Sequence, residues 1–224
     1  MTPDEFAAET NVSRETLARF QALHDLLLKW QARINLIGAG TREDIWRRHF
    51  LDSAQLFPLL PAPAVADSPP VLVDLGSGAG FPGLVLALLA SGETRPLAIN
   101  LVESDQRKAA FLIEAVRTLR LGESVNIHNR RAESLNGTLR ARVDVVTARA
   151  LADLRQLVVW SVPLLRSTGI CLFLKGTSAS DELTLAHKVW NMHSEILPSR
   201  SDPSGVILRL RGISRCPIPL NTLK

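Results

Sequence analysis

The chain has 224 residues, of which 46% are hydrophobic and 21% are charged, and its formal net charge is +4. This composition supplies the core of an ordinary globular protein, and the mild basic charge permits a phosphate-rich partner without demanding one. Two cysteines without a Cys-x-x-Cys pair argue against a disulfide framework or a zinc site, and we expect no bound metal. The N-terminus lacks the pattern of a signal peptide, and the longest apolar run, residues 84–90, is too short to cross a bilayer. We therefore expect a cytoplasmic protein without membrane contact.

The first part of the sequence is predicted to be helical. Between Leu17 and Ile34, apolar residues recur at helical spacing and form one stripe, which glycines then end. Thr41 is expected to cap a second helix that opens at Ile45. Prolines crowd residues 58–70, and prolines at this density break helices and mark a linker. The sequence is therefore divided into an N-terminal helical extension, residues 1–66, and a core that forms one structural unit, residues 67–224.

The core alternates short strands with helices. Because alternating strands and helices favour an open parallel sheet with helices on both faces, the fold class is α/β and Rossmann-like. In such sheets ligands bind at the carboxyl ends of the strands. The expected strands are Val71–Leu75, Leu97–Val102, Val125–His128, Val143–Ala148, Ile170–Leu174 and Val206–Leu210, and the expected helices are Pro82–Ala90, Gln106–Leu119, Leu151–Leu165 and Leu183–Met192.

A glycine-rich loop follows the first strand, with glycines at 76, 78 and 80 directly after Asp74-Leu75. Glycine permits positive φ and lets the backbone approach a ligand closely, and the helix that follows turns free N–H groups toward the loop. The alternative interpretation is a plain turn between a strand and a helix. Three glycines preceded by an acid favour a nucleotide-cofactor site.

The neighbouring acids indicate which nucleotide the loop holds. Gly78 to Gly83 matches the GxGxxG pattern of dinucleotide sites, so an NAD-dependent oxidoreductase is one alternative. However, Asp74 would repel a pyrophosphate, whereas it suits the cationic sulfonium and amino groups of S-adenosylmethionine. Glu103, which ends the second strand, comes later than the roughly 20-residue spacing of a dinucleotide site, and it can accept hydrogen bonds from both ribose hydroxyls. We therefore predict S-adenosylmethionine as the cofactor, with Asp74, Gly76, Gly78 and Glu103 in its site.

Two further segments end strands at the same edge of the predicted sheet. Ala132 and Glu133 follow the third strand and would face the adenine, although a solvated charge cluster is the alternative. Arg149 ends the fourth strand over the pocket, where the alternative is a surface ion pair.

These residues resemble one known family. Its motifs occur in order along the chain: Asn35-Leu36, Arg48-His49, Leu51-Asp52-Ser53, the run Val73 to Gly83, Arg107-Lys108 with Phe111-Leu112, Arg131-Ala132-Glu133, Arg149-Ala150 and Leu174-Lys175-Gly176. The sequence looks like a bacterial small-subunit ribosomal RNA guanine-N7 methyltransferase, also called glucose-inhibited division protein B. The likeness extends from about Leu23 to Gly176. Gln31, Ile37-Gly38 and the tail after Pro198 depart from the family pattern.

The resemblance implies a seven-stranded methyltransferase fold with an N-terminal helical lobe. It implies that Gly76, Phe81, the pair Ala132-Glu133 and Arg149 contact S-adenosylmethionine. It also implies one target, N7 of a single guanine in the conserved 530-loop region of 16S rRNA, within the small ribosomal subunit or its precursor. We expect the protein to act as a monomer.

Guanine N7 carries a lone pair and no hydrogen, so its methylation needs no general base, and we assign none. Catalysis should depend on alignment and electrostatics, with Arg149 and Lys175 as candidates for positioning the base. Because the major groove of an RNA helix is too narrow for side chains, the target should lie in a loop or bulge. His49 either contacts RNA or packs the second helix onto the core. Candidates for RNA binding are Arg47, Arg48, Arg107, Lys108 and Arg131.

Three alternatives remain open at this point. The first is a methyltransferase that acts on a small molecule, for which the aromatic content of 5% offers little material for a substrate lid. The second is the NAD-dependent oxidoreductase. The third is a ribosome-assembly factor that has kept the fold and transfers no methyl group.

Overall fold

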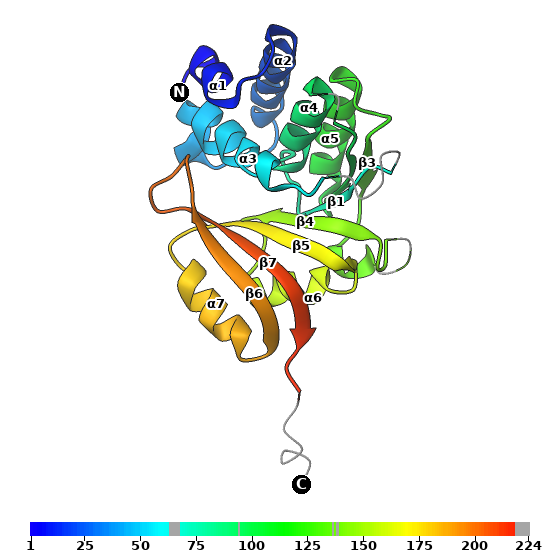
Figure 1. Ribbon diagram of the computed structural model, residues 1–224. Helices are drawn as coiled ribbons and strands as arrows, with labels where there is room; N and C mark the ends of the chain where they lie inside the picture. The colour runs from blue at the N-terminus through cyan, green and yellow to red at the C-terminus, as the bar shows by residue number, and fades with distance from the viewer. Residues whose placement is uncertain (63–67, 94, 136, 138, 218–224) are drawn as a thin grey trace.

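The computed structural model describes residues 1–62, 68–93, 95–135, 137 and 139–217. In this part of the chain seven strands form one sheet in the order β3-β2-β1-β4-β5-β7-β6, which confirms the α/β class and the seven-stranded sheet (Figure 1). The strands are β1 (Val71–Leu75), β2 (Ala98–Val102), β3 (Val125–His128), β4 (Val143–Arg149), β5 (Leu165–Lys175), β6 (Trp190–Pro198) and β7 (Val206–Arg215).

The sheet is mixed rather than wholly parallel. β1 to β5 run parallel, whereas β7 lies antiparallel to both β5 and β6. Two antiparallel strands need only a short connection, while parallel neighbours need a crossover. The expectation of a parallel sheet is therefore wrong at this edge, where β6 and β7 form a hairpin.

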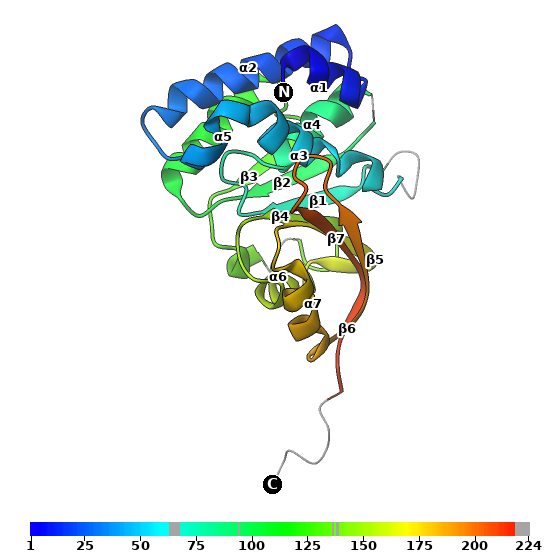
Figure 2. The ribbon, with the colours of Figure 1, turned by 90° about the vertical axis from the view of Figure 1, so that its left-hand side faces the viewer.

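Helices cover both faces of the sheet, as Figures 1 and 2 show. The N-terminal helices lie over the same face as the two helices that follow β1 and β2, and the remaining two helices cover the other face. The first group is α1 (Pro3–Thr10), α2 (Arg14–Gln31), α3 (Asp52–Ala54), α4 (Gly83–Gly92) and α5 (Gln106–Thr118), and the second is α6 (Leu154–Ser161) and α7 (Ala179–His187).

The N-terminal lobe shares its core with the sheet. Phe6, Phe20 and Phe50 are fully buried and belong to one apolar cluster with Leu84 of α4 and Leu101 of β2. The ring centroids of Phe6 and Phe20 lie 4.9 Å apart, and those of Phe20 and Phe50 lie 5.5 Å apart. The lobe is thus fixed against the sheet by continuous packing rather than by a tether.

The lobe differs in detail from the sequence prediction. The sequence analysis did not predict α1, which begins at a capping box of Thr2 and Glu5. Thr41 caps no helix: it lies within a 3-10 helix, Ala39–Asp44, and its hydroxyl donates to the carbonyl oxygen of Gly38. The next segment, Trp46–Leu51, is a π-helix. The predicted boundary at 66/67 and the middle of the proline linker lie outside the described residues.

The elements after β4 also differ from the prediction. α6 ends at Ser161 and β5 already begins at Leu165, so the helix expected to reach 165 was too long. The helix expected over residues 183–192 is α7, which ends at His187, and Trp190 instead opens β6, which the sequence analysis missed. Trp190 is buried in the apolar cluster on the α7 face of the sheet, and β6 gains its backbone partners from β7. None of the helices in the described residues has the length and apolar character needed to cross a membrane.

Candidate functional site

The glycine loop adopts the backbone conformation that its sequence predicts. Gly76, Gly78 and Gly80 have φ values of 66°, 54° and 85°, a region that other residues enter only with strain. At Gly76 an added Cβ would lie 2.5 Å from a methyl group of Leu151. The loop therefore turns tightly between β1 and α4 and presents bare backbone at the carboxyl end of β1.

Asp74 lies beneath this loop and is fully buried. Its carboxylate accepts hydrogen bonds from the Thr147 hydroxyl at 2.8 Å and from the Gly83 N–H at 3.1 Å. Thr147 is its register partner on β4. Burial raises the pKa of Asp74 to about 6, although these hydrogen bonds act in the opposite direction. The carboxylate thus anchors the start of α4 and is not among the residues that line the neighbouring cavity.

Glu103 fixes the loop from the end of β2. Its carboxylate accepts hydrogen bonds from the N–H groups of Gly78, at 2.9 Å, and Asp105, at 2.8 Å. The residue is buried, with 8% of its surface exposed. Each carboxylate oxygen keeps a further lone pair, so the group can still accept a ligand hydroxyl.

A cavity of about 620 Å³ opens at the carboxyl ends of β1, β4 and β5. The glycine loop, the N-terminal lobe, the ends of β4 and β5 and the connection between β6 and β7 meet around it, and the N-terminal parts of α5 and α7 add one side chain each from Lys108 and Glu182. Its lining includes Leu36, Ile37, Gly38, Thr41, Arg48, His49, Asp52, Gly76, Ser77, Gly78, Ala79, Phe81, Lys108, Arg149, Lys175, Glu182, Asp202 and Gly205. A cavity at this edge of an α/β sheet is the expected ligand site.

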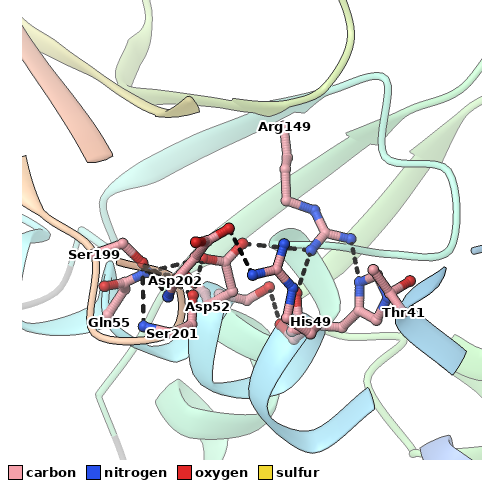
Figure 3. A network of polar contacts seen from close by, with 10 residues as sticks. Thr41, His49, Asp52, Gln55, Arg149, Ser199, Ser201 and Asp202 are labelled. Carbon is pink, nitrogen blue, oxygen red and sulfur yellow. Dashed lines mark hydrogen bonds and ion pairs between the residues drawn. The ribbon is translucent and has the colours of Figure 1, made fainter. Parts of the chain in front are cut away.

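Arg149 projects from the end of β4 into this cavity (Figure 3). One terminal nitrogen donates to the Arg48 carbonyl oxygen at 3.0 Å and to Asp52 at 3.4 Å, and the other donates to Nδ1 of His49 at 2.6 Å. The guanidinium carbon lies 5.0 Å from the ring centroid of Phe81. Burial lowers the pKa of Arg149, and Asp52 opposes this shift. The side chain is held by the lobe and is not a surface ion-pair member.

His49 lies between Arg149 and the lobe. Its Nε2 lies 2.8 Å from the Thr41 hydroxyl, and its ring stacks on Phe81 with centroids 5.0 Å apart and planes at 20°. Burial, together with the charges of Arg149 and Arg48, lowers the pKa of His49 to about 3. The imidazole is therefore neutral at physiological pH.

Residues distant in the sequence complete the network in Figure 3. Asp52 accepts from the Ser201 hydroxyl at 2.5 Å and from the Gln55 amide at 3.0 Å, and Arg48 forms an ion pair with Asp202 at 2.6 Å. The connection between β6 and β7 is thus bonded to the lobe beside the cavity. The sequence analysis missed Thr41, Gln55, Ser201 and Asp202 as site residues. Ser201 lies 149 positions from Asp52, so local sequence gives no signal for the contacts that the β6–β7 connection makes with the lobe.

Lys175 lines the cavity from the end of β5. Its ammonium donates to the carbonyl oxygen of Ala152 at 2.8 Å and forms an ion pair with Glu182 at 2.6 Å. Burial works to raise the pKa of Glu182, but hydrogen bonds from Lys175, Ser178 and the Leu154 N–H outweigh it and leave the pKa lowered. The positive charge that Lys175 brings to the cavity is therefore balanced by the negative charge of Glu182.

The pair Ala132-Glu133 does not line the main cavity. It begins a 3-10 helix, Ala132–Leu135, and lines a second cavity of about 500 Å³ together with Trp160, Trp190 and Arg215. The structure brings Gly76, Gly78, Phe81, Arg149 and Lys175 to one cavity, sets Asp74 and Glu103 behind its loop, and leaves this pair apart.

The RNA-binding candidates differ in their surroundings. Lys108, in the first turn of α5, lines the main cavity and makes no ion pair with the described residues. Arg47 lies 3.7 Å from Asp44, and Arg107 lies 3.6 Å from Asp105. Arg131 is exposed, and Arg48 is paired with the β6–β7 connection as described above.

Residues 16–202 match the family described as rRNA small subunit methyltransferase G. The chain belongs to this family. It is 51% identical to "Ribosomal RNA small subunit methyltransferase G" of Paramagnetospirillum magneticum over 96% of this chain and 98% of that protein. The protein of the same name from Rhodospirillum rubrum is also 51% identical, over 96% of this chain and 100% of its own length. The family resemblance predicted from the motifs is confirmed.

Solved structures show the same fold at low sequence identity. A methyltransferase from Geobacter sulfurreducens superposes with a TM-score of 0.56 at 12% identity and covers 87% of this chain and 88% of its own. A putative transferase from Pyrococcus horikoshii gives a TM-score of 0.56 at 14% identity, over 83% and 67%. The predicted methyltransferase fold is therefore confirmed.

Membership of the rRNA small subunit methyltransferase G family confirms the predicted S-adenosylmethionine cofactor and the predicted methylation of small-subunit rRNA. It favours these over the oxidoreductase that the GxGxxG pattern had left open. The glycine loop suits this cofactor, because its three left-handed residues leave bare backbone at the carboxyl ends of the strands.

Proposed function

We propose that this methyltransferase acts on N7 of a single guanine in the conserved 530-loop region of 16S rRNA. The supporting observation is that the acceptor side chains lining the cavity already receive hydrogen bonds or ion pairs from other protein groups. Neutral His49 receives the Arg149 N–H, Asp52 receives three side-chain donors, and Glu182 is bound to Lys175. Within the described lining, each of these groups is already engaged as an acceptor. Asp202, the remaining carboxylate of the described lining, is paired with Arg48. A cavity whose carboxylates and imidazole are all bound to protein donors suits a nucleophile that has no proton to lose, and guanine N7 is one.

The cofactor supplies an electrophilic methyl group on a sulfonium. Gly76, Gly78 and Phe81 would hold it at the glycine loop, Arg149 would contact it from the end of β4, and Glu103 would accept from the ribose hydroxyls. Asp74 would contribute from below the loop by fixing the start of α4, as its bond to Gly83 indicates. For Ala132-Glu133 the support is the family resemblance alone.

Arg149 and Lys175 would position the base from the ends of β4 and β5. Positive charge moves from the cofactor to the guanine during transfer, so a cation beside N7 would oppose the reaction unless it is compensated. Both cations are compensated, by Asp52 and Glu182 respectively. Their contribution would therefore be alignment rather than attraction.

RNA binding would use cationic side chains, of which Lys108 and Arg48 line the cavity. Lys108 is the strongest candidate, because it lines the cavity and makes no ion pair with the described residues. Arg47, Arg48, Arg107 and Arg131 would add contacts to phosphates. We further propose that the protein acts in the cytoplasm as a monomer, on 16S rRNA or the small ribosomal subunit.

The test is methyl transfer in vitro. Purified protein is incubated with methyl-labelled S-adenosylmethionine and with either naked 16S rRNA or small subunits from cells that lack the modification. We expect one methyl group per 16S rRNA, and cleavage chemistry specific for 7-methylguanosine should map it to one guanine of the 530-loop region. No label on either substrate, with folded protein that binds the cofactor, would contradict transfer to this RNA. Label on another atom or another loop would contradict the assigned target.

A further inference from the structure

The guanidinium of Arg149 is fixed on one side by a single imidazole. Among the side chains bonded to it, His49 makes the shorter contact, 2.6 Å against 3.4 Å for Asp52. The same imidazole stacks on Phe81, whose ring also faces the guanidinium. His49 therefore touches both residues that the cavity places beside the glycine loop.

The hydrogen bonds allow only one tautomer of His49. A guanidinium has donors and no acceptor, so the Nδ1 that receives Arg149 must carry a lone pair. Since the ring is neutral, its hydrogen is on Nε2 and is donated to the Thr41 hydroxyl, which in turn donates to the carbonyl oxygen of Gly38. The result is a directed series of hydrogen bonds from Arg149 to the backbone of the lobe.

The local backbone sets the direction of this ring. His49 lies in the π-helix Trp46–Leu51, whereas Phe50, the next residue, is fully buried in the lobe core. π-helical turns are uncommon and recur at functional sites. Here the turn places His49 toward the cavity while Phe50 packs inward.

We propose that His49 is a positioning residue of the methyltransferase, which holds Arg149 in place in the cofactor cavity through its Nδ1 atom. This inference rests on the proposed cofactor contact of Arg149. His49 itself touches neither cofactor nor RNA in this role, so its effect must pass through Arg149.

Two amide variants of His49 test the roles of its two ring nitrogens, Nδ1 and Nε2, separately. In His49→Asn the amide oxygen occupies about the place of Nδ1 and can accept from Arg149. In His49→Gln the amide reaches about the place of Nε2 and can meet Thr41, but no acceptor remains at Nδ1. Loss of a hydrogen bond to a charged group corresponds to about a tenfold to hundredfold change in an equilibrium constant. We expect His49→Gln to weaken binding of S-adenosylhomocysteine by at least tenfold and His49→Asn by less than about threefold.

The experiment measures binding of S-adenosylhomocysteine by calorimetry for both variants, alone and combined with Arg149→Ala, with the melting temperature as a control for folding. If His49 acts through Arg149, His49→Gln weakens binding in the native background and adds nothing in the Arg149→Ala background. Equal losses in both backgrounds, or equal losses for the Asn and Gln variants, would overturn the inference. Unchanged binding by Arg149→Ala alone would instead refute the proposed role of Arg149.

Thr41→Val provides a second route if His49→Gln does not fold. It removes the partner of Nε2 while keeping the side-chain shape, so the ring loses its distal anchor. We expect binding of S-adenosylhomocysteine to weaken by about threefold to tenfold, and only when Arg149 is present. Native affinity in Thr41→Val would count against the inference.

Discussion

At the scale of single residues, the glycine loop depends on conformations that only glycine adopts without strain. For Gly76→Ala we expect a loss of about 1–2 kcal/mol in the free energy of unfolding, because a left-handed conformation costs this much with a Cβ. Leu151 must also move, since the new Cβ would lie 2.5 Å from its methyl group. Cofactor binding should weaken as the loop shifts. Urea denaturation and calorimetry measure the two effects.

Gly122→Ala is the matched control for this variant. An added Cβ at Gly122 would meet no atom within 4 Å, and its φ is not left-handed. We expect stability within about 0.5 kcal/mol of the native protein and unchanged cofactor affinity. Equal effects of the two substitutions would show that the conformation of Gly76 is not the cause.

The neutral state of His49 makes stability depend on pH. Its pKa is about 3 in the folded protein and 6.5 in the unfolded chain. As the pH falls below 6.5, the unfolded chain binds a proton that the folded protein excludes, so stability is lost by about 1.4 kcal/mol per pH unit until the pH reaches about 3. Relative to His49→Asn, the native protein should lose about 2 kcal/mol of unfolding free energy between pH 6.5 and pH 5.

The native protein must be compared with His49→Asn because the titration of Asp74 changes the free energy of unfolding in the opposite direction. Its pKa is about 6 in the folded protein against 3.8 in the unfolded chain, so the folded protein binds a proton first and gains relative stability as the pH falls from 6 to 3.8. This contribution is common to both proteins and cancels in the difference. Urea denaturation at several pH values gives that difference, and a value independent of pH would mean that His49 protonates readily in the fold.

At the scale of elements, the β6–β7 connection is bonded to the lobe beside the cavity. Asp202→Asn removes the charge that pairs with Arg48 at 2.6 Å, so we expect a loss of about 1 kcal/mol in the free energy of unfolding. Asp181→Asn is the control, because Asp181 is exposed in the first turn of α7. Its effect should stay within about 0.5 kcal/mol. Chemical denaturation measures both, and equal values would show that the ion pair adds nothing to the docking of the connection.

The elements that the sequence predicted are those with a strong local pattern. The strand Val71–Leu75 was predicted with its observed bounds, and α5 to within one residue, because buried runs and an amphipathic stripe identify them without tertiary context. β6 was missed because His187 to Trp190 offers no glycine or proline to end the preceding helix. Its strand state depends on pairing with β7, which local sequence does not show.

The residues of the site also divide into those with a local sequence signal and those whose contacts depend on tertiary structure. Gly76, Gly78 and Arg149, which line the cavity, could be proposed as site residues from the sequence because strand ends and left-handed turns leave local signals. The sequence also identified Asp74 as important, but its partner Thr147 lies 73 positions away and their pairing follows only from the register of β1 and β4. The same sequence is compatible with an Asp74 carboxylate that points toward the cofactor and with one that points beneath the loop. The sequence pattern could therefore not distinguish these two orientations.

At the scale of the whole molecule, one apolar cluster joins the lobe to α4, α5 and one face of the sheet. Trp30 of α2 adds a hydrogen bond to Glu114 of α5 at 3.1 Å. Separate folding of the lobe would expose this shared core to water. The N-terminal extension and the core predicted from the sequence should therefore unfold together.

Four tryptophans allow this cooperativity to be measured. Trp30 and Trp46 report on the lobe, while Trp160 and Trp190 lie with the apolar cluster on the other face of the sheet. Two variants are needed, one with Phe at 30 and 46 and one with Phe at 160 and 190. In each, the urea transition followed by the remaining tryptophans should coincide with that followed by circular dichroism, as in a two-state transition. If the lobe tryptophans report a lower midpoint than circular dichroism, the lobe detaches first. The Arg149 network would then be lost before the sheet unfolds, because its acceptors His49 and Asp52 belong to the lobe.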